Sequence, residues 1–228
     1  MSLVKVSRED VLEEKNRVLD TKEINVRKGY LVTKRFVDII GALCGIILLF
    51  PIFIIVTLLI KYEDPKGTVF FKQARVGKSG REFYMYKFRS MSTDAEEKLK
   101  DLLKYNEVSG AMFKMKDDPR VTKIGKFIRR TSIDELPQLI NVLMGDMSLV
   151  GPRPPLLREV NEYTDYQKQR LLVTPGCTGF WQVSGRSSLG FEEMVELDLT
   201  YIQNRNIFLD FKIIFKTFKV LLGSKDAY

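Results

Sequence analysis

The chain has 228 residues, of which 45% are hydrophobic, enough for one folded domain with an appendage and too many for a disordered chain. Its formal net charge of +8 predicts attraction to polyanions, but a nucleic acid, an anionic membrane and a diphosphate substrate all fit that charge. The chain has no histidine, which excludes serine–histidine triads, and its two cysteines lack the spacing of a zinc site or a disulfide framework. Acid–base or nucleophilic chemistry must therefore come from Asp, Glu, Lys, Tyr, Ser or Cys.

Residues 1–33 mix basic and acidic side chains with few apolar ones, and we expect a solvated, partly helical lead-in there. Residues 39–60 contain no charge, and as a helix these 22 residues would be about 33 Å long, enough to cross a bilayer. The alternative is a buried helix of a soluble protein, but such helices rarely stay apolar on every side for this length. We therefore expect a membrane-embedded segment over residues 34–62.

Pro51 lies near the middle of this apolar segment, where it removes a backbone hydrogen bond and favours a kink or break. Basic residues lie on both sides of the segment, so the positive-inside rule gives no clear orientation. Two cytoplasmic ends suit a re-entrant helical hairpin better than a crossing. Kinked spanning helices are common, however, so the proline alone does not decide between the two.

The remaining residues, 63–228, alternate between strand and helix patterns. Aromatic-rich runs at 69–71 and 83–88, separated by a glycine-containing turn, predict a β-hairpin. Residues 92–105 read as a charged surface helix, and apolar or amphipathic helical patterns cover residues 121–130, 136–143, 192–204 and 207–222. We expect an α+β fold that is mostly helical, with a re-entrant membrane hairpin, a small β-sheet and amphipathic surface helices.

The last of these helices has lysines clustered on one side, as in helices that lie at a membrane surface. Asp210 and Thr217 project to its far side and spoil the apolar face. A helix packed on the globular core is therefore an equal alternative.

Asp134 and Glu135 are adjacent carboxylates at a point where a helix should begin, shortly after Arg129 and Arg130. Ser132 followed by Glu135 fits a capping box, and acidic first turns are common, so taken alone the pair is an N-terminal cap. The amides of a helix start and the nearby arginines would keep a carboxylate ionised. An ionised carboxylate can act as a nucleophile or bind Mg²⁺.

Several basic side chains are candidates for binding phosphate. Prolines on both sides of Arg153 restrict its backbone, so it loses little freedom on binding; the alternative is a rigid loop with a surface arginine. Lys87 and Arg89 share one face of a predicted strand, about 7 Å apart, which suits a diphosphate, although solvated edge-strand charges look the same. The other candidates, on predicted strands and loops, are Arg75, Arg120 and Arg186.

Taken together and in order, these residues resemble the bacterial sugar transferase family of monotopic phosphoglycosyl transferases, over residues 31–225. The resemblance rests on eight short motifs: Lys34-Arg35 with Asp38, Pro51, Gln73-Ala74-Arg75, Lys87 to Met91, Asp134 to Gln138, Gly145 to Ser148, Gly151 to Pro154, and Gly179 to Arg186. One departure is Phe50 before the proline, where members often carry serine. Larger relatives add spanning helices before the catalytic region, so this chain resembles the minimal form or the catalytic part alone.

The resemblance implies that Asp134 attacks the β-phosphate of a UDP-sugar, giving a covalent phosphosugar-aspartate and releasing UMP, and that polyprenyl phosphate then attacks this intermediate. It implies Glu135 as a base or partner, Mg²⁺ beside Asp134, and phosphate contacts from the basic candidates. The implied partners are a UDP-sugar, polyprenyl (undecaprenyl) phosphate and membrane lipid, with no nucleic acid; a homo-oligomer is left open. The implied location is the cytoplasmic face of the inner membrane, with a monotopic chain whose residues 63–228 form the catalytic domain.

Two other functions fit part of the sequence. A basic membrane-tethered scaffold without chemistry explains the charge, the apolar segment and the lysine-lined last helix, but it gives no reason for adjacent carboxylates beside arginines. A glycosyl transferase that moves only the sugar would release UDP instead of UMP.

Overall fold

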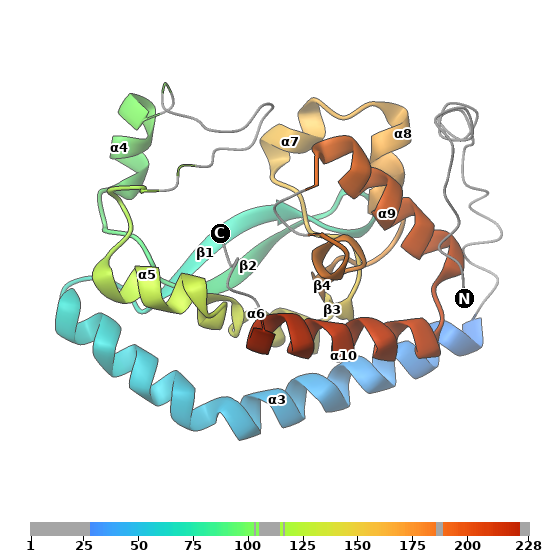
Figure 1. The fold of residues 1–228 in the computed structure, drawn as a ribbon, viewed down its shortest axis with the longest axis horizontal. Helices are drawn as coiled ribbons and strands as arrows, with labels where there is room; N and C mark the ends of the chain where they lie inside the picture. Colours follow the sequence, from blue (N-terminus) through green and yellow to red (C-terminus); the bar gives the residue numbers. More distant parts are fainter. Residues whose placement is uncertain (1–27, 103, 105–114, 116, 186–188, 224–228) are drawn as a thin grey trace.

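The computed structural model describes residues 28–102, 104, 115, 117–185 and 189–223. One long helix, α3 (Lys28–Glu63), runs along one side, and shorter helices and two small sheets pack above it (Figure 1). The mostly helical α+β fold is confirmed. Of the expected lead-in, residues 1–27 lie outside the described residues, and residues 28–33 form the first turns of α3.

Helix α3 is continuous through Pro51 and bends in its middle, so that both of its ends rise toward the rest of the protein (Figure 1). A proline inside a helix removes a backbone hydrogen bond and is a usual cause of such a bend. The most apolar stretch of α3 has a mean hydropathy of 3.1 and is only 11% buried, whereas the core helix of a soluble protein is mostly buried. The structure does not confirm the expected break into a two-armed hairpin.

The inner side of α3 packs on the protein along its length. Gly41 approaches Leu149 so closely that a Cβ would lie 2.6 Å from that side chain. Farther along, Val56 and Ile60 join a buried cluster with Phe88 of the hairpin. The opposite side of α3 is left exposed, and its large apolar side chains face outward.

Strands β1 (Phe70–Val76) and β2 (Glu82–Phe88) form the expected antiparallel hairpin, joined by the 3-10 turn η1 (Lys78–Gly80). Ser79 and Gly80 have positive φ angles, 57° and 79°, as a tight turn of this kind requires. A second, parallel pair, β3 (Ser148–Val150) and β4 (Gly176–Thr178), was not expected from the sequence.

The expected helices are all present, with ends shifted by a few residues: α4 (Ala95–Leu102), α5 (Lys123–Arg130), α6 (Gln138–Met144), α9 (Phe191–Asn204) and α10 (Ile207–Gly223). Short elements fill the connections from β3 to β4 and from β4 to α9: α7 (Leu157–Asn161), α8 (Asp165–Lys168), η4 (Gln169–Leu172) and η5 (Trp181–Val183).

Helix α10 packs on the protein with one side and exposes the other. The two residues that spoil its apolar face point inward: Asp210 pairs with Lys34, and Thr217 Oγ1 lies 2.7 Å from Thr178 Oγ1. The outer side carries four phenylalanines that are 42–79% exposed: Phe208, Phe211, Phe215 and Phe218. The alternative of a helix packed on the core is confirmed, and the helix also presents an apolar outer surface; its place at a membrane surface stays a prediction.

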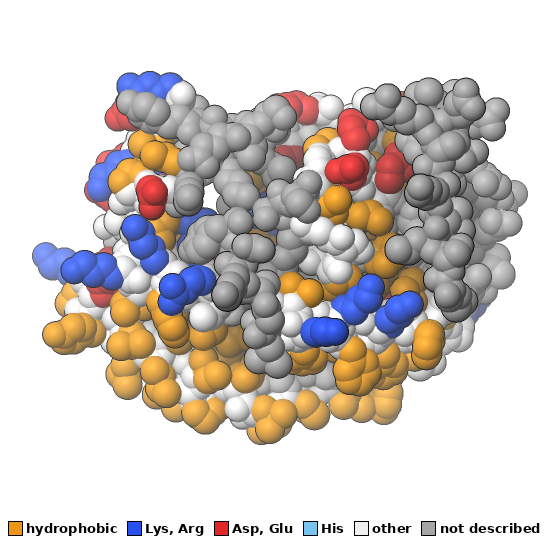
Figure 2. All heavy atoms as spheres, in the orientation of Figure 1, with side chains coloured by type: hydrophobic (Ala, Val, Ile, Leu, Met, Phe, Trp, Pro, Cys, Tyr) orange, Lys and Arg blue, Asp and Glu red, His pale blue; other side chains and the backbone are white. Residues whose placement is uncertain are grey.

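The exposed apolar side chains of α3 and α10 gather on one edge of the molecule. Figure 2 shows hydrophobic side chains along the lower edge, with Lys and Arg side chains in a row above them. This order, apolar below and basic above, is the one that proteins at a membrane surface present to lipid.

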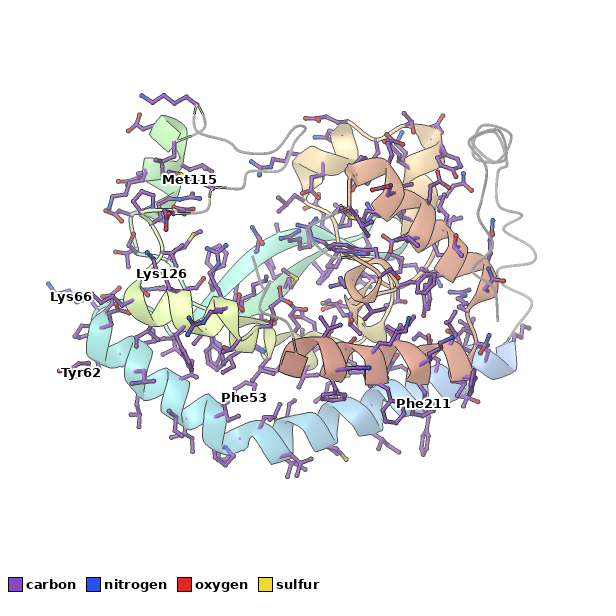
Figure 3. The ribbon with its side chains drawn as sticks, viewed as in Figure 1. Phe53, Tyr62, Lys66, Met115, Lys126 and Phe211 are labelled. Atoms are coloured by element: carbon purple, nitrogen blue, oxygen red, sulfur yellow. The ribbon has the colours of Figure 1, made fainter. Side chains whose placement is uncertain are left out.

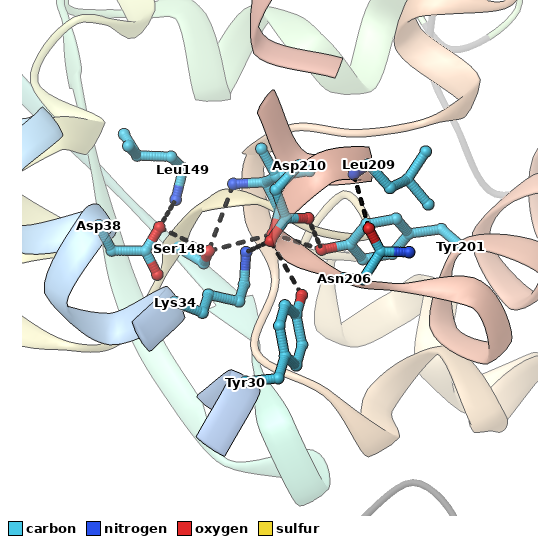
Figure 4. Close-up of polar contacts among 10 residues, drawn as sticks. Tyr30, Lys34, Asp38, Ser148, Leu149, Tyr201, Asn206, Leu209 and Asp210 are labelled. Atoms are coloured by element: carbon cyan, nitrogen blue, oxygen red, sulfur yellow. Dashed lines mark hydrogen bonds and ion pairs between the residues drawn. The ribbon is translucent and has the colours of Figure 1, made fainter. Parts of the chain in front are cut away.

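A buried polar cluster ties the N-terminal half of α3 to the domain (Figure 4). We call it the α3 clasp, and its members are Tyr30, Lys34, Asp38, Ser148, Tyr201 and Asp210. Asp210 is 4% exposed and accepts hydrogen bonds from Lys34, Tyr30 and Tyr201 at 2.7–3.0 Å. Asp38 accepts a hydrogen bond from the side chain that opens β3, at 3.0 Å. The clasp explains why Lys34 and Asp38 precede the apolar part of α3: both side chains bond to the rest of the domain.

Candidate active site

Asp134 and Glu135 lie on a 3-10 turn, η3 (Ile133–Glu135), between α5 and α6. Ser132, just before this turn, has φ 55° and ψ 17°, in the left-handed region, and its side chain makes no capping hydrogen bond. The capping-box interpretation is therefore wrong. A non-glycine residue in this region costs on the order of 1–3 kcal/mol, and such strain persists mainly at functional sites.

The turn is fixed from below by α3. Ile133 and Leu136, on either side of the carboxylates, pack against the buried cluster that contains Val56 and Ile60. The carboxylates therefore lie over the C-terminal half of α3, at the border between the domain and the apolar edge.

The turn is also fixed against the hairpin by one buried side chain, Asn141 of α6. Its Nδ2 donates to the backbone oxygen of Tyr84 at 2.8 Å, and its Oδ1 accepts from the backbone nitrogen of Tyr86 at 2.9 Å. This pair of bonds aligns α6 with β2. The next residue of β2, Lys87, then reaches Glu135, with 2.7 Å between Nζ and Oε1.

Asp134 is 7% exposed, and its pKa is raised from 3.8 to about 6. Burial is the main cause; the charge of Glu135 adds to it, while Lys87 and Arg129 act in the opposite direction. The nearby arginine favours the ionised form, as expected from the sequence, but burial outweighs it, so the pKa lies above its ordinary value. At neutral pH the carboxyl of Asp134 is still mostly ionised, since its pKa lies below 7.

Glu135 is shifted the other way. Burial opposes its ionisation, but the ammonium of Lys87 outweighs that effect, with help from Arg153 and Arg75, so the pKa of Glu135 is lowered. Adjacent carboxyls whose surroundings move their pKa values apart are typical of sites where the two groups have different chemical roles.

The proline-restricted loop after β3 holds two arginines near Glu135: Arg153, which lies on the loop, and Arg75, which reaches the loop from β1. Arg75 Nη1 donates to the backbone oxygen of Pro154 at 2.9 Å, and Arg153 Nη1 lies 3.6 Å from Glu159 Oε2. Burial and the charge of Arg153 lower the pKa of Arg75 to about 10, and both arginines act on Glu135. Arg75 Nε is buried without a hydrogen-bond partner among the described residues. Together with Lys87, these side chains form a group of three positive charges near Glu135.

Two other predicted phosphate ligands are engaged elsewhere. Arg89 lies beyond the end of β2, with Nη1 3.4 Å from Asp64 Oδ2 and Nη2 bonded to Thr68. Arg120 is buried and holds the carboxylate of Asp118 at 2.6–3.2 Å. The structure therefore brings Arg75, Lys87 and Arg153 to the carboxylates, but not Arg89 or Arg120. Arg186 lies outside the described residues.

Asn141 and Glu159, which position Lys87 and Arg153, were not predicted from the sequence. A signal for Asn141 was present, because it interrupts an apolar helical stretch, and a buried amide must find hydrogen-bond partners. Glu159 accepts from the backbone nitrogen of Leu156 at 2.9 Å, so its local pattern looks like an ordinary helix start.

No group of three or more metal-ligating side chains occurs in the part of the chain that the structure describes. Mg²⁺, however, is commonly held by one or two carboxylates together with the phosphates of a substrate. Asp134 and Glu135 supply such a pair. Their chemistry fits a Mg²⁺ ion that is bound jointly with a diphosphate.

These features are those of an enzyme that acts on phosphate esters beside a membrane. Comparison with known families makes the class specific. The chain belongs to the bacterial sugar transferase family, which it matches over residues 29–224.

Individual relatives agree with this family. The chain is 53% identical over 200 residues to the galactosyl transferase CpsE of Streptococcus agalactiae serotype III (strain NEM316), covering 87% of this chain and 44% of CpsE. It is 44% identical over 199 residues to the undecaprenyl-phosphate galactose phosphotransferase of Salmonella typhimurium, covering 86% and 41%. The uncharacterized sugar transferase EpsL of Bacillus subtilis is 42% identical over 200 residues, with 86% and 90% covered. The chain thus spans less than half of the first two relatives and most of EpsL.

Proposed function

We propose that this chain transfers a sugar-1-phosphate from a UDP-sugar to polyprenyl phosphate and releases UMP. The observation that carries the proposal is the pair of Asp134, buried with a raised pKa, and Glu135, ion-paired to Lys87, on a strained turn. The names of relatives support it, since they include galactose and N-acetylgalactosamine phosphotransferases that use undecaprenyl phosphate. Because these relatives carry different sugars, the proposal does not specify the sugar.

In the first step, the Asp134 carboxylate attacks the β-phosphorus of the UDP-sugar. A bond forms between a carboxylate oxygen and phosphorus, the bond from phosphorus to the bridging oxygen breaks, and UMP leaves with that oxygen and its electron pair. The carboxylate must be ionised to attack, which its pKa of about 6 permits at neutral pH. Burial keeps water away from the attacking oxygen and from the intermediate.

In the second step, a phosphate oxygen of the polyprenyl carrier attacks the same phosphorus, and Asp134 leaves as a carboxylate. Lys87, Arg75 and Arg153 stabilise the negative charge on the non-bridging oxygens in both steps. Glu135 holds the Lys87 ammonium in place at 2.7 Å. When bound by the two carboxylates, Mg²⁺ would supply neutralisation of the diphosphate charge.

We also infer that α3 enters the membrane from the cytoplasmic side and returns to it. Both ends of α3 are bonded to the same domain: Lys34 to Asp210 at one end, and Glu63 to the backbone nitrogens of Lys123 and Ile124 at the other, at 2.8 and 3.1 Å. A single domain cannot lie on both sides of a membrane. The bend of α3 (Figure 1) supports this re-entrant, monotopic arrangement.

Identification of the released nucleotide tests the reaction. The chain is incubated with a panel of UDP-sugars and polyprenyl phosphate, and we expect UMP from at least one donor. Release of UDP would indicate transfer of the sugar alone, and no release from any donor would favour the non-catalytic scaffold.

A second experiment tests the intermediate. Mass spectrometry of the protein mixed with the active donor alone should show a sugar-phosphate adduct on Asp134. The variant Asp134→Ala should form no adduct and release no UMP. UMP release that persists in this variant would contradict the mechanism.

A further inference from the structure

A cavity of about 200 Å³ opens at the N-terminal end of α3, away from the candidate active site. Its walls come from α3, η1, the start of β3 and the end of α9. Four of the lining side chains are cationic: Lys34, Arg35, Lys78 and Arg205. Two carboxylates face them, Asp38 in the wall and Asp210 paired with Lys34, so the cavity keeps a net positive charge.

Three of these cations are already held in place. Lys34 is bonded to Asp210 at 3.0 Å, Arg35 donates to two backbone oxygens at the C-terminal end of α6 at 2.6 and 2.8 Å, and Arg205 lies over the ring of Tyr30 at 5.7 Å. Side chains that are fixed before binding lose little conformational entropy when an anion arrives. The fourth, Lys78, is exposed on η1 at the rim.

The cavity lies where the surface of α3 changes from polar to apolar. Val32 and Phe36, on the same turns as the lining residues, are 71% and 64% exposed, and Phe208 of α10 is 79% exposed. In the proposed membrane placement Phe36 and Phe208 enter the lipid, and Val32 lies at the level of the headgroups. The cavity then opens at the depth of the lipid headgroups.

The size of the cavity limits what it can hold. Pockets that enclose a drug-sized ligand have volumes of roughly 300–1,000 Å³, so this one has room for a phosphate ester but not for a nucleotide-sugar. It is also distinct from the place of the reaction. Asp38 of α3 lines the cavity, whereas the part of α3 that packs under η3 begins at Ile52. The helix between Asp38 and Ile52 is about 21 Å long.

We propose that this cavity binds the phosphate headgroup of an anionic membrane phospholipid, separately from the lipid that accepts the sugar. The proposal rests on the membrane placement of α3 given above, but not on the reaction. Such a lipid would be held by the same residues that clasp α3, and would therefore strengthen the attachment of α3 to the domain.

Lipid binding to the full chain in detergent tests this proposal. Native mass spectrometry counts bound lipid during titration with phosphatidylglycerol, phosphatidylcholine or inorganic phosphate. We expect one retained phosphatidylglycerol and much weaker retention of phosphatidylcholine. The variant Lys78→Gln should bind phosphatidylglycerol about fivefold more weakly, as expected for one lysine at a lipid surface, and Lys78→Arg should bind it as the unaltered chain does.

A matched control is Lys66→Gln, which removes the same charge from an exposed lysine at the other end of α3 (Figure 3). It should leave binding unchanged. Equal loss in both glutamine variants would show diffuse attraction and overturn the proposal, as would unchanged binding in Lys78→Gln. Inorganic phosphate that binds as tightly as phosphatidylglycerol in the same titration would overturn the lipid assignment. Since no sugar donor is present, a failure of the proposed reaction would leave this result unaffected.

Discussion

Asp134 and Glu135 are neighbours in the chain, yet their surroundings shift their pKa values in opposite directions. Glu135 has a lysine within 2.7 Å, so its charge stabilises the folded state. Asp134 is more deeply buried, and its ionised form is disfavoured by folding. A residue that weakens the fold at neutral pH is expected where a reactive carboxylate is needed.

The variant Asp134→Asn should therefore be more stable than the unaltered chain at pH 7.5. The pKa of Asp134 in the folded state, about 6, exceeds the ordinary value of 3.8, so the ionised group destabilises the folded state above pH 6. A difference of two pKa units corresponds to about 3 kcal/mol. This cost disappears as the pH falls below 3.8, so the gain from the substitution should shrink toward zero near pH 4. Denaturant unfolding at the two pH values measures it.

The matched variant is Glu135→Gln, which should lower stability at pH 7.5 because it leaves Lys87 without its carboxylate. If Asp134→Asn also lowered stability at both pH values, Asp134 would be a structural cap and not a strained reactive group.

Formation of the aspartyl adduct should rise with pH through a midpoint near 6, because only the ionised Asp134 can attack. Arg129 lowers the pKa of Asp134, so Arg129→Gln should move the midpoint to higher pH. Single-turnover UMP release with donor alone, between pH 5 and 8, measures both midpoints. A rate that does not change over this range would contradict the assignment of Asp134 as the attacking group.

The elements differ in how far local sequence determines them. Helices α9 and α10 could be predicted because apolar residues recur at helical spacing, and the hairpin because aromatic runs flank a glycine turn. Strands β3 and β4 have three residues each and pair in parallel across a long connection, so no local pattern marks them. Sheet alternation predicted Lys87 and Arg89 on one face of a strand, but β2 ends at Phe88, and the Arg89 side chain contacts Asp64.

At the candidate site, too, local sequence patterns predict only part of the structure. The sequence singled out the two carboxylates, but it also predicted a cap where the structure has a left-handed residue. The approach of Lys87 to Glu135 depends on Asn141, whose bonds to β2 span more than 50 residues of sequence. Such long-range contacts leave no periodic signal, and the resemblance to a family supplied the roles that local patterns could not.

The left-handed backbone conformation of Ser132 limits which residues fit at this position without strain. Ser132→Gly should raise the free energy of unfolding by about 1 kcal/mol, because glycine adopts a φ of 55° without strain. Ser132→Val should lower it by more than 1 kcal/mol, since β-branched residues are strongly disfavoured there. Equal stability of the two variants in denaturant unfolding would show that the backbone at this position is not left-handed in solution.

The α3 clasp can be tested through its central carboxylate. Asp210→Ala removes the partner of Lys34, whose side chain is only 12% exposed, and should destabilise the protein by about 3 kcal/mol. Combining it with Lys34→Met should recover much of this loss, because no buried charge then remains unpaired. Additive losses in the double-mutant cycle would mean that the two side chains are not coupled.

At the scale of the whole molecule, one continuous apolar edge is formed by helices from opposite ends of the described chain, α3 and α10 (Figure 2). The turn η3, which carries Asp134, lies close to this edge, over α3. In the proposed reaction, a soluble nucleotide-sugar and a lipid-borne phosphate would meet at this turn. The sequence predicted the apolar segment, but not that both its ends attach to one domain, because those attachments join residues far apart in the chain.

The two attachments make a definite prediction for the topology of α3. After Cys44 and Cys177 are replaced by alanine, single cysteines are introduced at Val32, Leu48 and Tyr62, all of which are 71–88% exposed. An impermeant maleimide should label positions 32 and 62 in inside-out vesicles and neither in intact cells, since both ends lie on the cytoplasmic side. Position 48 should stay unlabelled in both, because it lies within lipid. Labelling of either end from outside intact cells would mean that α3 crosses the membrane, and the domain would then have to release one end of the helix.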